Sequence, residues 1–171
     1  MSNDSFTEQA ARRIARLSER CKDPGFRASL RHWLSATARP RSYQSLMELR
    51  GSLEDSDFNT VAALFAYHPM HHDNSGDVGK ICRKLAVGFN TFEGRFKRLL
   101  LCDAEEIQEH LRPIILAARA KKVEVDYLQL YLDLRSWGHD FFGDEVRRRW
   151  AEGFWSEQPE ESSAKASEVV S

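Results

Sequence analysis

FEGRFKRLLL, residues 92–101, has the pattern of a short helix with one apolar face. The apolar residues follow the i, i+4, i+7, i+8 spacing of that face: Phe92, Phe96, Leu99 and Leu100. Arg95 falls at the border of the face, whereas Lys97 and Arg98 point toward solvent. We expect this helix to be anchored in a core while it presents positive charge. Leu101 falls almost opposite the apolar face, and we predict that it contacts another helix or a neighbouring subunit.

The same helical spacing recurs along almost the whole chain. Capping residues, prolines and glycines divide the chain into expected helices at residues 5–21, 24–34, 42–50, 57–67, 78–85, 92–101, 103–122, 127–137 and 144–155. No segment alternates between apolar and polar residues for long enough to predict a strand. The fold class is therefore all-α, a single compact bundle-like domain of about eight or nine helices over residues 1–155. Residues 156–171 contain no aromatic residue and predict a disordered acidic tail.

The net charge of −1 over 171 residues hides a segregation of charge along the chain. Residues 25–50 contain five Arg and one Glu, residues 51–79 contain five acids and no Lys or Arg, and residues 80–101 contain six basic residues and one Glu. The three segments therefore carry +4, −5 and +5. A local basic surface attracts polyanions even on a slightly acidic protein.

The cysteines and the apolar runs indicate where the protein resides. The three cysteines, Cys21, Cys82 and Cys102, are odd in number and far apart, which suits free thiols in a reducing cytosol. The N-terminus lacks the pattern of a signal peptide, and no apolar run approaches the ~20 residues that a membrane span needs. We expect a cytoplasmic protein with no membrane partner.

Basic residues recur on several expected helices, and the helix at residues 24–34 contains no acid. Arg27 and Arg31 lie one turn apart, and an incoming anion would relieve the repulsion between them. The candidates for contact with nucleic-acid phosphates are Arg27, Arg31, Lys80, Lys84, Arg95, Arg98, Arg119 and Lys121. The alternative is that these residues are solvated helix faces, and Arg119 and Lys121 also suit the helix dipole in the last turn of their helix.

An enzyme is the weaker interpretation of the sequence. The chain has no glycine-rich phosphate loop, Cys-x-x-Cys pair, His-Glu-x-x-His motif or nucleophile elbow, and we expect no cofactor. The rival hypothesis is a metal-dependent phosphohydrolase that uses two His-Asp groups as ligands: His71, His72, Asp73, His139 and Asp140. Both groups follow helix breakers, so they lack the rigid support that catalytic ligands need. A third hypothesis is a helical protein–protein adaptor that makes no nucleic-acid contact.

Short motifs in a fixed order give the chain a family resemblance. They are Gly25-Phe-Arg-Ala-Ser-Leu-Arg31, His68-Pro69, Gly79-Lys80, Arg95-Phe-Lys-Arg-Leu-Leu100, Leu111-Arg112, Val125-Asp126-Tyr127-Leu128, Asp133-Leu134, Trp137, Trp150 and Phe154-Trp155. In this order and spacing the chain resembles CasB, the small subunit of the type I-E CRISPR Cascade surveillance complex. The resemblance covers nearly the whole chain except the tail. It adds Arg112 to the nucleic-acid-binding candidates, because Arg112 keeps the family's charge at that position.

The resemblance implies a non-enzymatic, all-α subunit of a ribonucleoprotein for antiviral defence. Its implied partners are the repeated backbone subunit, the large subunit, a second copy of itself, guide RNA and target DNA. It also implies that the subunit lies along guide and target and helps to hold the displaced DNA strand, which stabilises the R-loop.

Overall fold

The computed structural model describes residues 3–156, which fold into helices joined by short loops. Over this range the chain forms nine α-helices and two 3-10 helices: α1 (Asn3–Arg20), α2 (Pro24–Arg31), η1 (His32–Leu34), η2 (Arg39–Ser42), α3 (Tyr43–Arg50), α4 (Ser56–Tyr67), α5 (Val78–Ala86), α6 (Phe92–Leu101), α7 (Ile107–Lys121), α8 (Tyr127–Trp137) and α9 (Asp140–Trp155). The prediction of an all-α fold is confirmed. The predicted tail lies outside the described residues, apart from Ser156.

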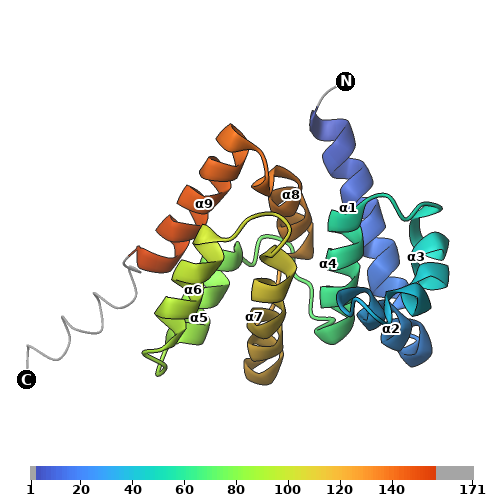
Figure 1. Cartoon of the computed structure of the whole chain (residues 1–171), viewed down its shortest axis with the longest axis horizontal. Helices are drawn as coiled ribbons and strands as arrows, with labels where there is room; N and C mark the ends of the chain where they lie inside the picture. The colour runs from blue at the N-terminus through green and yellow to red at the C-terminus, as the bar shows by residue number, and fades with distance from the viewer. Residues whose placement is uncertain (1–2, 157–171) are drawn as a thin grey trace, which may run out of the picture.

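Two groups of helices are joined by α7 and α8 (Figure 1). On one side, α2 packs on α4, and α1 and α3 pack around them. On the other side, α5 packs on α9 and α6. Helix α8 contacts α1, α4 and α9, and helix α7 contacts α4, α5 and α6. These two helices therefore position residues from one group against residues from the other.

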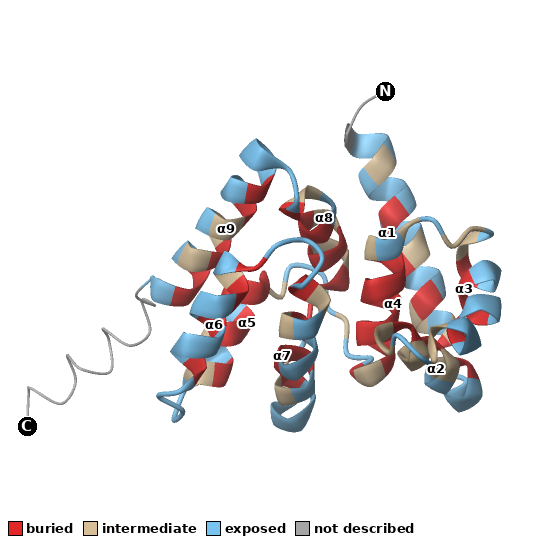
Figure 2. Ribbon diagram, viewed as in Figure 1, coloured by how far each residue is buried: buried red, intermediate tan, exposed pale blue. Residues whose placement is uncertain are grey.

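Helix α4 forms the centre of the N-terminal group. All residues from 58 to 66 are buried, so the helix has no polar outer face (Figure 2). Its first turn is capped by Asp55, whose side chain accepts a hydrogen bond of 3.0 Å from the backbone N–H of Phe58. A short helix that is buried all round must be covered on every side by other elements. Helices α2, α7 and α8 cover α4 here.

Capping residues explain most helix ends that the sequence predicts. Asp23 and Asp126 cap α2 and α8 through their side chains, and Gly51 ends α3 with a left-handed φ of 72°.

Three predicted starts are off by two or more residues. Helix α7 begins at Ile107, four residues late, because Asp103 accepts from the backbone N–H groups of Glu105 and Glu106 in a turn before the helix. Helix α1 already includes Asn3, two residues before the predicted start. Helix α9 begins at Asp140, four residues early, because His139 acts as its N-cap and accepts a hydrogen bond from the backbone N–H of Phe142.

Helix α6 has the predicted bounds, and its apolar face packs as predicted. Phe92, Phe96 and Leu99 are buried. Leu101 is 85% exposed, so the expectation that it meets another helix is wrong within the part of the chain that the structure describes. A contact with a neighbouring subunit stays a prediction.

Helices α5, α8 and α9 are locked together by a close approach and a buried ionic group. A Cβ added at Gly79 would lie 1.9 Å from the carbonyl oxygen of Trp150, so only glycine fits between α5 and α9. Asp133 is 2% exposed and accepts hydrogen bonds from Trp150 Nε1 and Gln129 Nε2, both at 2.8 Å. Asp133 also pairs with Arg149, which reaches Asp77 at 3.3 Å. These contacts hold α5 against α8 and α9, and α6 packs on α5.

No helix within residues 3–156 is both long and apolar enough to span a membrane. The three cysteines are free and buried.

Candidate nucleic-acid interface

Helix α7 carries basic residues on two different flanks. Arg112 and Arg119 are seven residues apart, which places them on the same flank at 100° per residue. Their flank faces α4, as the contact of Arg112 with Tyr67 shows. Lys121 lies on the other flank and reaches α5, where Nζ donates to the carbonyl oxygen of Leu85 at 3.0 Å. The predicted pair Arg119 and Lys121 is therefore divided between two basic groups.

The first group surrounds Tyr67, the last residue of α4. The guanidinium carbons of Arg31 and Arg112 lie 5.2 and 5.3 Å from the centre of the Tyr67 ring. Arg112 Nη2 also donates a hydrogen bond of 3.2 Å to the Tyr67 hydroxyl. Arg27 and Arg119 are close enough to Arg31 for their positive charges to lower its pKa, after the larger effect of burial. We call Arg27, Arg31, Tyr67, Arg112 and Arg119 the Tyr67 cluster.

The electrostatics of Arg31 reflect both its burial and its neighbours. Burial is the largest cause that lowers the pKa of Arg31, followed by the positive charges of Arg27 and Arg119. Its Nε donates to the carbonyl oxygen of Ala66 at 3.0 Å, so Arg31 also caps the C-terminus of α4. Repulsion among like charges weakens the free cluster, and a bound anion would remove that repulsion.

The second group lines a cavity of about 280 Å³ between α5, α6 and α7. Arg95 from α6 and Lys121 from α7 both line it. The aromatic rings of Phe89 and Phe92 form part of the same wall. We call the residues that line this cavity the Phe89 pocket: Leu85, Phe89, Thr91, Phe92, Arg95, Ala117, Ala120 and Lys121.

The two groups lie along one edge of the molecule. The loop between α5 and α6, the C-terminal end of α7, the C-terminal end of α4 and helix α2 follow one another along the lower edge in Figure 1. We call the Tyr67 cluster together with the Phe89 pocket the basic edge. The backbone segments that carry the two groups are far apart in the sequence and lie along the same edge of the molecule in this view.

Three of the nine predicted residues have no contact that places them in either group. Lys80 lies beside Asp77, whose pKa it lowers slightly against the larger effect of burial. Lys84 is exposed one turn further along α5. Arg98 is exposed one turn beyond Arg95, on the same flank of α6.

Many charged residues outside the predicted nucleic-acid-binding set form ion pairs. Within residues 3–156, none of the nine predicted residues forms an ion pair with an acid. The ion pairs of the described chain include Arg12–Glu8, Arg20–Glu48, Lys22–Glu19, Arg50–Asp55, Arg135–Asp55, Lys97–Glu93, Arg148–Asp144, Arg149–Asp77 and Arg149–Asp133. Asp55 lies at the start of α4, whose twelve residues span about 18 Å to Tyr67. This separation exceeds the screening length of about 8 Å at physiological salt, so Asp55 does not neutralise the Tyr67 cluster.

Sequence reasoning missed the aromatic partners of these cations. Tyr67 was expected only at the end of a helix, and Phe89 falls in a loop without periodicity. No local pattern links either residue to arginines or lysines that are distant in sequence. The separation of Arg119 from Lys121, in contrast, follows from helical geometry and could have been found at 100° per residue.

Comparison with known proteins identifies the family of the chain. Residues 9–155 match the family described as CRISPR-associated protein Cse2. The chain belongs to the Cse2 family. No curated protein sequence matches the chain.

Solved structures share the fold of this Cse2-family chain. A Cse2-family CRISPR-associated protein from Thermus thermophilus superposes with a TM-score of 0.73 at 24% identity, over 92% of this chain and 100% of that chain. CasB from M. ruber gives 0.62 at 20% identity, over 93% and 98%. A chain of a structure described as a CRISPR RNA-guided surveillance complex gives 0.69 at 19% identity, over 96% and 99%. The predicted resemblance to CasB is confirmed.

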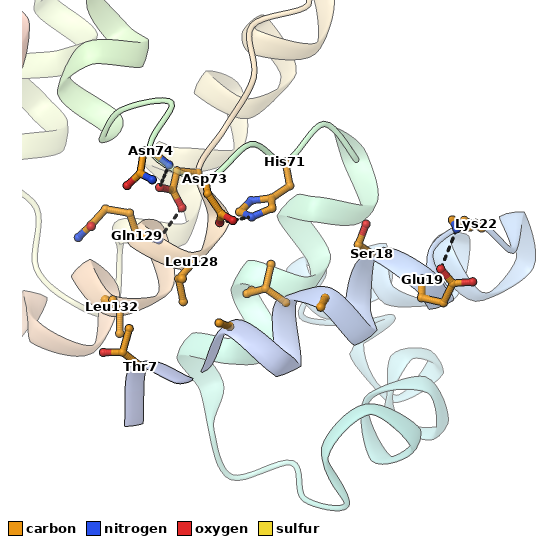
Figure 3. A pocket seen from close by; sticks show the side chains of 14 residues that line it. Thr7, Ser18, Glu19, Lys22, His71, Asp73, Asn74, Leu128, Gln129 and Leu132 are labelled. Atoms are coloured by element: carbon orange, nitrogen blue, oxygen red, sulfur yellow. Dashed lines mark hydrogen bonds and ion pairs between the residues drawn. The ribbon is translucent and has the colours of Figure 1, made fainter. Parts of the chain in front are cut away.

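The predicted metal ligands of the Cse2-family chain do not form one site. His71 and Asp73 line a groove between α1 and α8 (Figure 3), whereas His139 and Asp140 line a different pocket at the start of α9. His139 is occupied as the N-cap of α9. His72 is exposed and is not among the residues that line either pocket.

One compact group of possible ligands remains, in which Asp126 joins His71 and Asp73. Their ligand atoms lie within 4.8 Å of one another. His71 Nδ1 accepts from the backbone N–H of Tyr127 at 3.1 Å, so Nε2 holds the proton and donates to Asp73 at 2.9 Å (Figure 3). Asp126 accepts from the backbone N–H groups of Asn74 and Gln129. His71, Asp73 and Asp126 already form hydrogen bonds that hold the loop 68–77 against α8. These bonds explain why the three side chains lie close together without a metal ion.

Proposed function

We propose that this chain is a non-catalytic small subunit of a type I-E CRISPR Cascade complex and binds nucleic-acid backbone without sequence specificity. The observation that carries this proposal is the basic edge. Arg31 and Arg112 lie against the Tyr67 ring, and the charges of Arg27 and Arg119 act on Arg31. None of the four forms an ion pair with an acid in the described chain. Arginines next to an aromatic ring keep guanidinium N–H groups available for phosphate oxygens.

The absence of sequence specificity follows from how RNA-guided complexes read DNA. Base pairing with the guide RNA reads the sequence, so a protein subunit needs only charge and shape. Exchange of a DNA duplex for an RNA–DNA heteroduplex is nearly balanced in energy. A basic surface that holds the displaced strand can therefore stabilise the R-loop with only a few phosphate contacts.

The proposed partners follow from the family and the fold. One structural neighbour is a chain of a CRISPR RNA-guided surveillance complex. We propose that this chain likewise joins a repeated backbone subunit, a large subunit and a second copy of itself, on guide RNA and target DNA. Leu101, 85% exposed and opposite the buried face of α6, is the predicted contact for one of these subunits. The proposed location is the cytoplasm.

The experiment compares R-loops made by the assembled complex with wild-type subunit and with Arg27→Glu combined with Arg112→Glu. We expect the variant to assemble and its R-loops to dissociate several-fold faster, because two phosphate contacts become repulsive. A matched control is Arg12→Glu combined with Arg148→Glu, which changes the net charge equally at two arginines already paired with acids. Unchanged R-loop lifetimes in the first variant would refute the proposal and favour a protein–protein adaptor.

A further inference from the structure

The Phe89 pocket combines an apolar floor with positive charge at its rim. Leu85, Phe92, Ala117 and Ala120 contribute apolar surface, and Arg95 and Lys121 contribute the charge. None of the described residues that line it is acidic. Its volume of about 280 Å³ lies just below the range of about 300–1,000 Å³ that holds drug-sized ligands. The pocket therefore suits a single heterocyclic ring system rather than a larger molecule.

Phe89 is held in position although its ring is 56% exposed. Its backbone N–H donates to the carbonyl oxygen of Ala86 at 3.0 Å, and its own carbonyl oxygen accepts from the N–H of Phe92 at 3.1 Å. Gly88, with a φ of 84°, makes the turn that brings Phe89 back toward α6. An exposed aromatic ring whose backbone is fixed on both sides is already arranged for a stacking partner.

Lys121 supports the same ring from α7. Its Nζ lies 4.5 Å from the centre of the Phe89 ring and donates to the carbonyl oxygens of Leu85 and Val87 at 3.0 and 3.4 Å. These contacts tie the loop to α7. They also keep one positive charge at the rim of the pocket.

Arg95 provides the second charge from α6. Its guanidinium carbon lies 5.6 Å from the centre of the Phe92 ring, and it has no acidic partner within the described residues. Two cations on either side of an aromatic cavity match the chemistry of a nucleotide in a strand, in which an apolar base is flanked by two phosphates. A protein side chain would satisfy the apolar floor but would leave both cations without an anion.

We infer that the Phe89 pocket takes up one unstacked base of a single-stranded nucleic acid, with Arg95 and Lys121 on the adjacent phosphates. The inference rests on the proposed function and deepens it, because it names single strands as the favoured form. A base in a duplex is stacked and paired and cannot enter the pocket. Stacking of a base on an aromatic side chain is tolerant of sequence, which agrees with binding that does not read sequence.

The test uses the full chain and two single-stranded twenty-nucleotide probes labelled with the same fluorophore. One probe is oligothymidine, and the other has the same phosphates but abasic sites in place of the bases. We expect the wild-type chain to bind the oligothymidine about tenfold more tightly, in line with the stacking of one base. Phe89→Ala should remove this preference while its affinity for the abasic probe stays unchanged.

Phe141→Ala is the matched control. Phe141 is 63% exposed at the start of α9, outside the pocket, so its substitution removes a similar ring and should keep the preference for oligothymidine. Equal binding of both probes by the wild-type chain, with normal salt dependence, would overturn the pocket but leave the proposed function intact. An unchanged preference in Phe89→Ala would also overturn the pocket, because the bases would then be bound elsewhere on the chain. Absence of binding to either probe at low salt would overturn both.

Discussion

Arg31 and Arg112 come from helices 81 positions apart in sequence, yet both place a guanidinium group against the ring of Tyr67, at 5.2 and 5.3 Å from its centre. The two arginines differ in how much the fold depends on them. Arg31 is partly buried and caps α4 through the carbonyl oxygen of Ala66. Arg112 is exposed and contacts only the side chain of Tyr67. Substitutions can therefore separate a role in binding from a role in stability.

Arg31→Ala and Arg112→Ala should both weaken the binding of single-stranded DNA. Each should reduce the dependence of log affinity on log salt by about 0.7, the contribution of one phosphate on a single strand. Arg31→Ala should also lower the free energy of unfolding by about 1–2 kcal/mol, because the carbonyl oxygen of Ala66 loses a charged donor. Arg112→Ala should change it by less than about 0.5 kcal/mol. Urea unfolding and fluorescence anisotropy measure the two effects. If Arg112→Ala binds like wild type, Tyr67 and its arginines are only a packing feature.

Gly79→Ala should be strongly destabilising. The new Cβ would meet the carbonyl oxygen of Trp150 at 1.9 Å, so α5 and α9 must move apart at a cost of about 3 kcal/mol or more. The matched control is Gly94→Ala in α6, where a Cβ meets nothing within 4 Å and the chain should gain about 0.5–1 kcal/mol. Urea unfolding of both variants checks the prediction. Similar stabilities would show that α5 and α9 are not packed as described.

Alkaline pH should destabilise the fold through its buried thiols. Burial raises the pKa of Cys21 and of Cys102 to about 11 and also raises the pKa of Cys82. An unfolded thiol has a pKa of about 8.5, so above that pH the unfolded chain loses protons that the folded chain keeps. The free energy of unfolding should therefore be fully retained below about pH 8.5 and fall as the pH rises toward 11. Urea unfolding at pH 8 and pH 10 measures the fall, which should be smaller in Cys21→Ala. A rise in stability over this range would contradict the burial of the thiols.

Metal removal should leave the protein unchanged. His71 is hydrogen-bonded to Asp73 and to the backbone N–H of Tyr127, and Asp126 accepts from the backbone N–H groups of Asn74 and Gln129. A metal ion would therefore have to displace existing hydrogen bonds. Dialysis against a chelator should not alter the melting temperature, and added zinc or manganese should not raise it. Elemental analysis of about one equivalent of metal, lost in His71→Ala, would instead support the phosphohydrolase hypothesis.

The sequence predicts the parts of the fold that depend on local chemistry. The bounds of α6 follow from its apolar face, and those of α8 from its apolar face, the Asp126 cap and the terminating Gly138. The start of α9 was missed because His139 is an unusual N-cap, so the sequence there lacks the usual signal. The central position of α4 was missed because a helix that is apolar all round has no face that indicates its surroundings.

For the candidate site, the sequence predicts which basic residues are available but not how they are grouped. The basic segments of the chain can be found by inspection, and none of the nine predicted residues has an ion pair within residues 3–156. Which of them share a surface depends on the packing of α7 between α4 and α5. The rings of Tyr67 and Phe89 become part of the site only through that packing.

The central claim is that the basic edge, rather than net charge, binds the strand. The most direct measurement is the affinity of the full chain for single-stranded DNA over a range of salt, for Arg95→Glu combined with Arg112→Glu and for the control Arg12→Glu combined with Arg148→Glu. Both pairs change the net charge equally. The account predicts that the first pair weakens binding at least about tenfold and flattens the salt dependence by about 1.4, whereas the control stays within about twofold of wild type. Equal weakening by both pairs, or none by either, would contradict it.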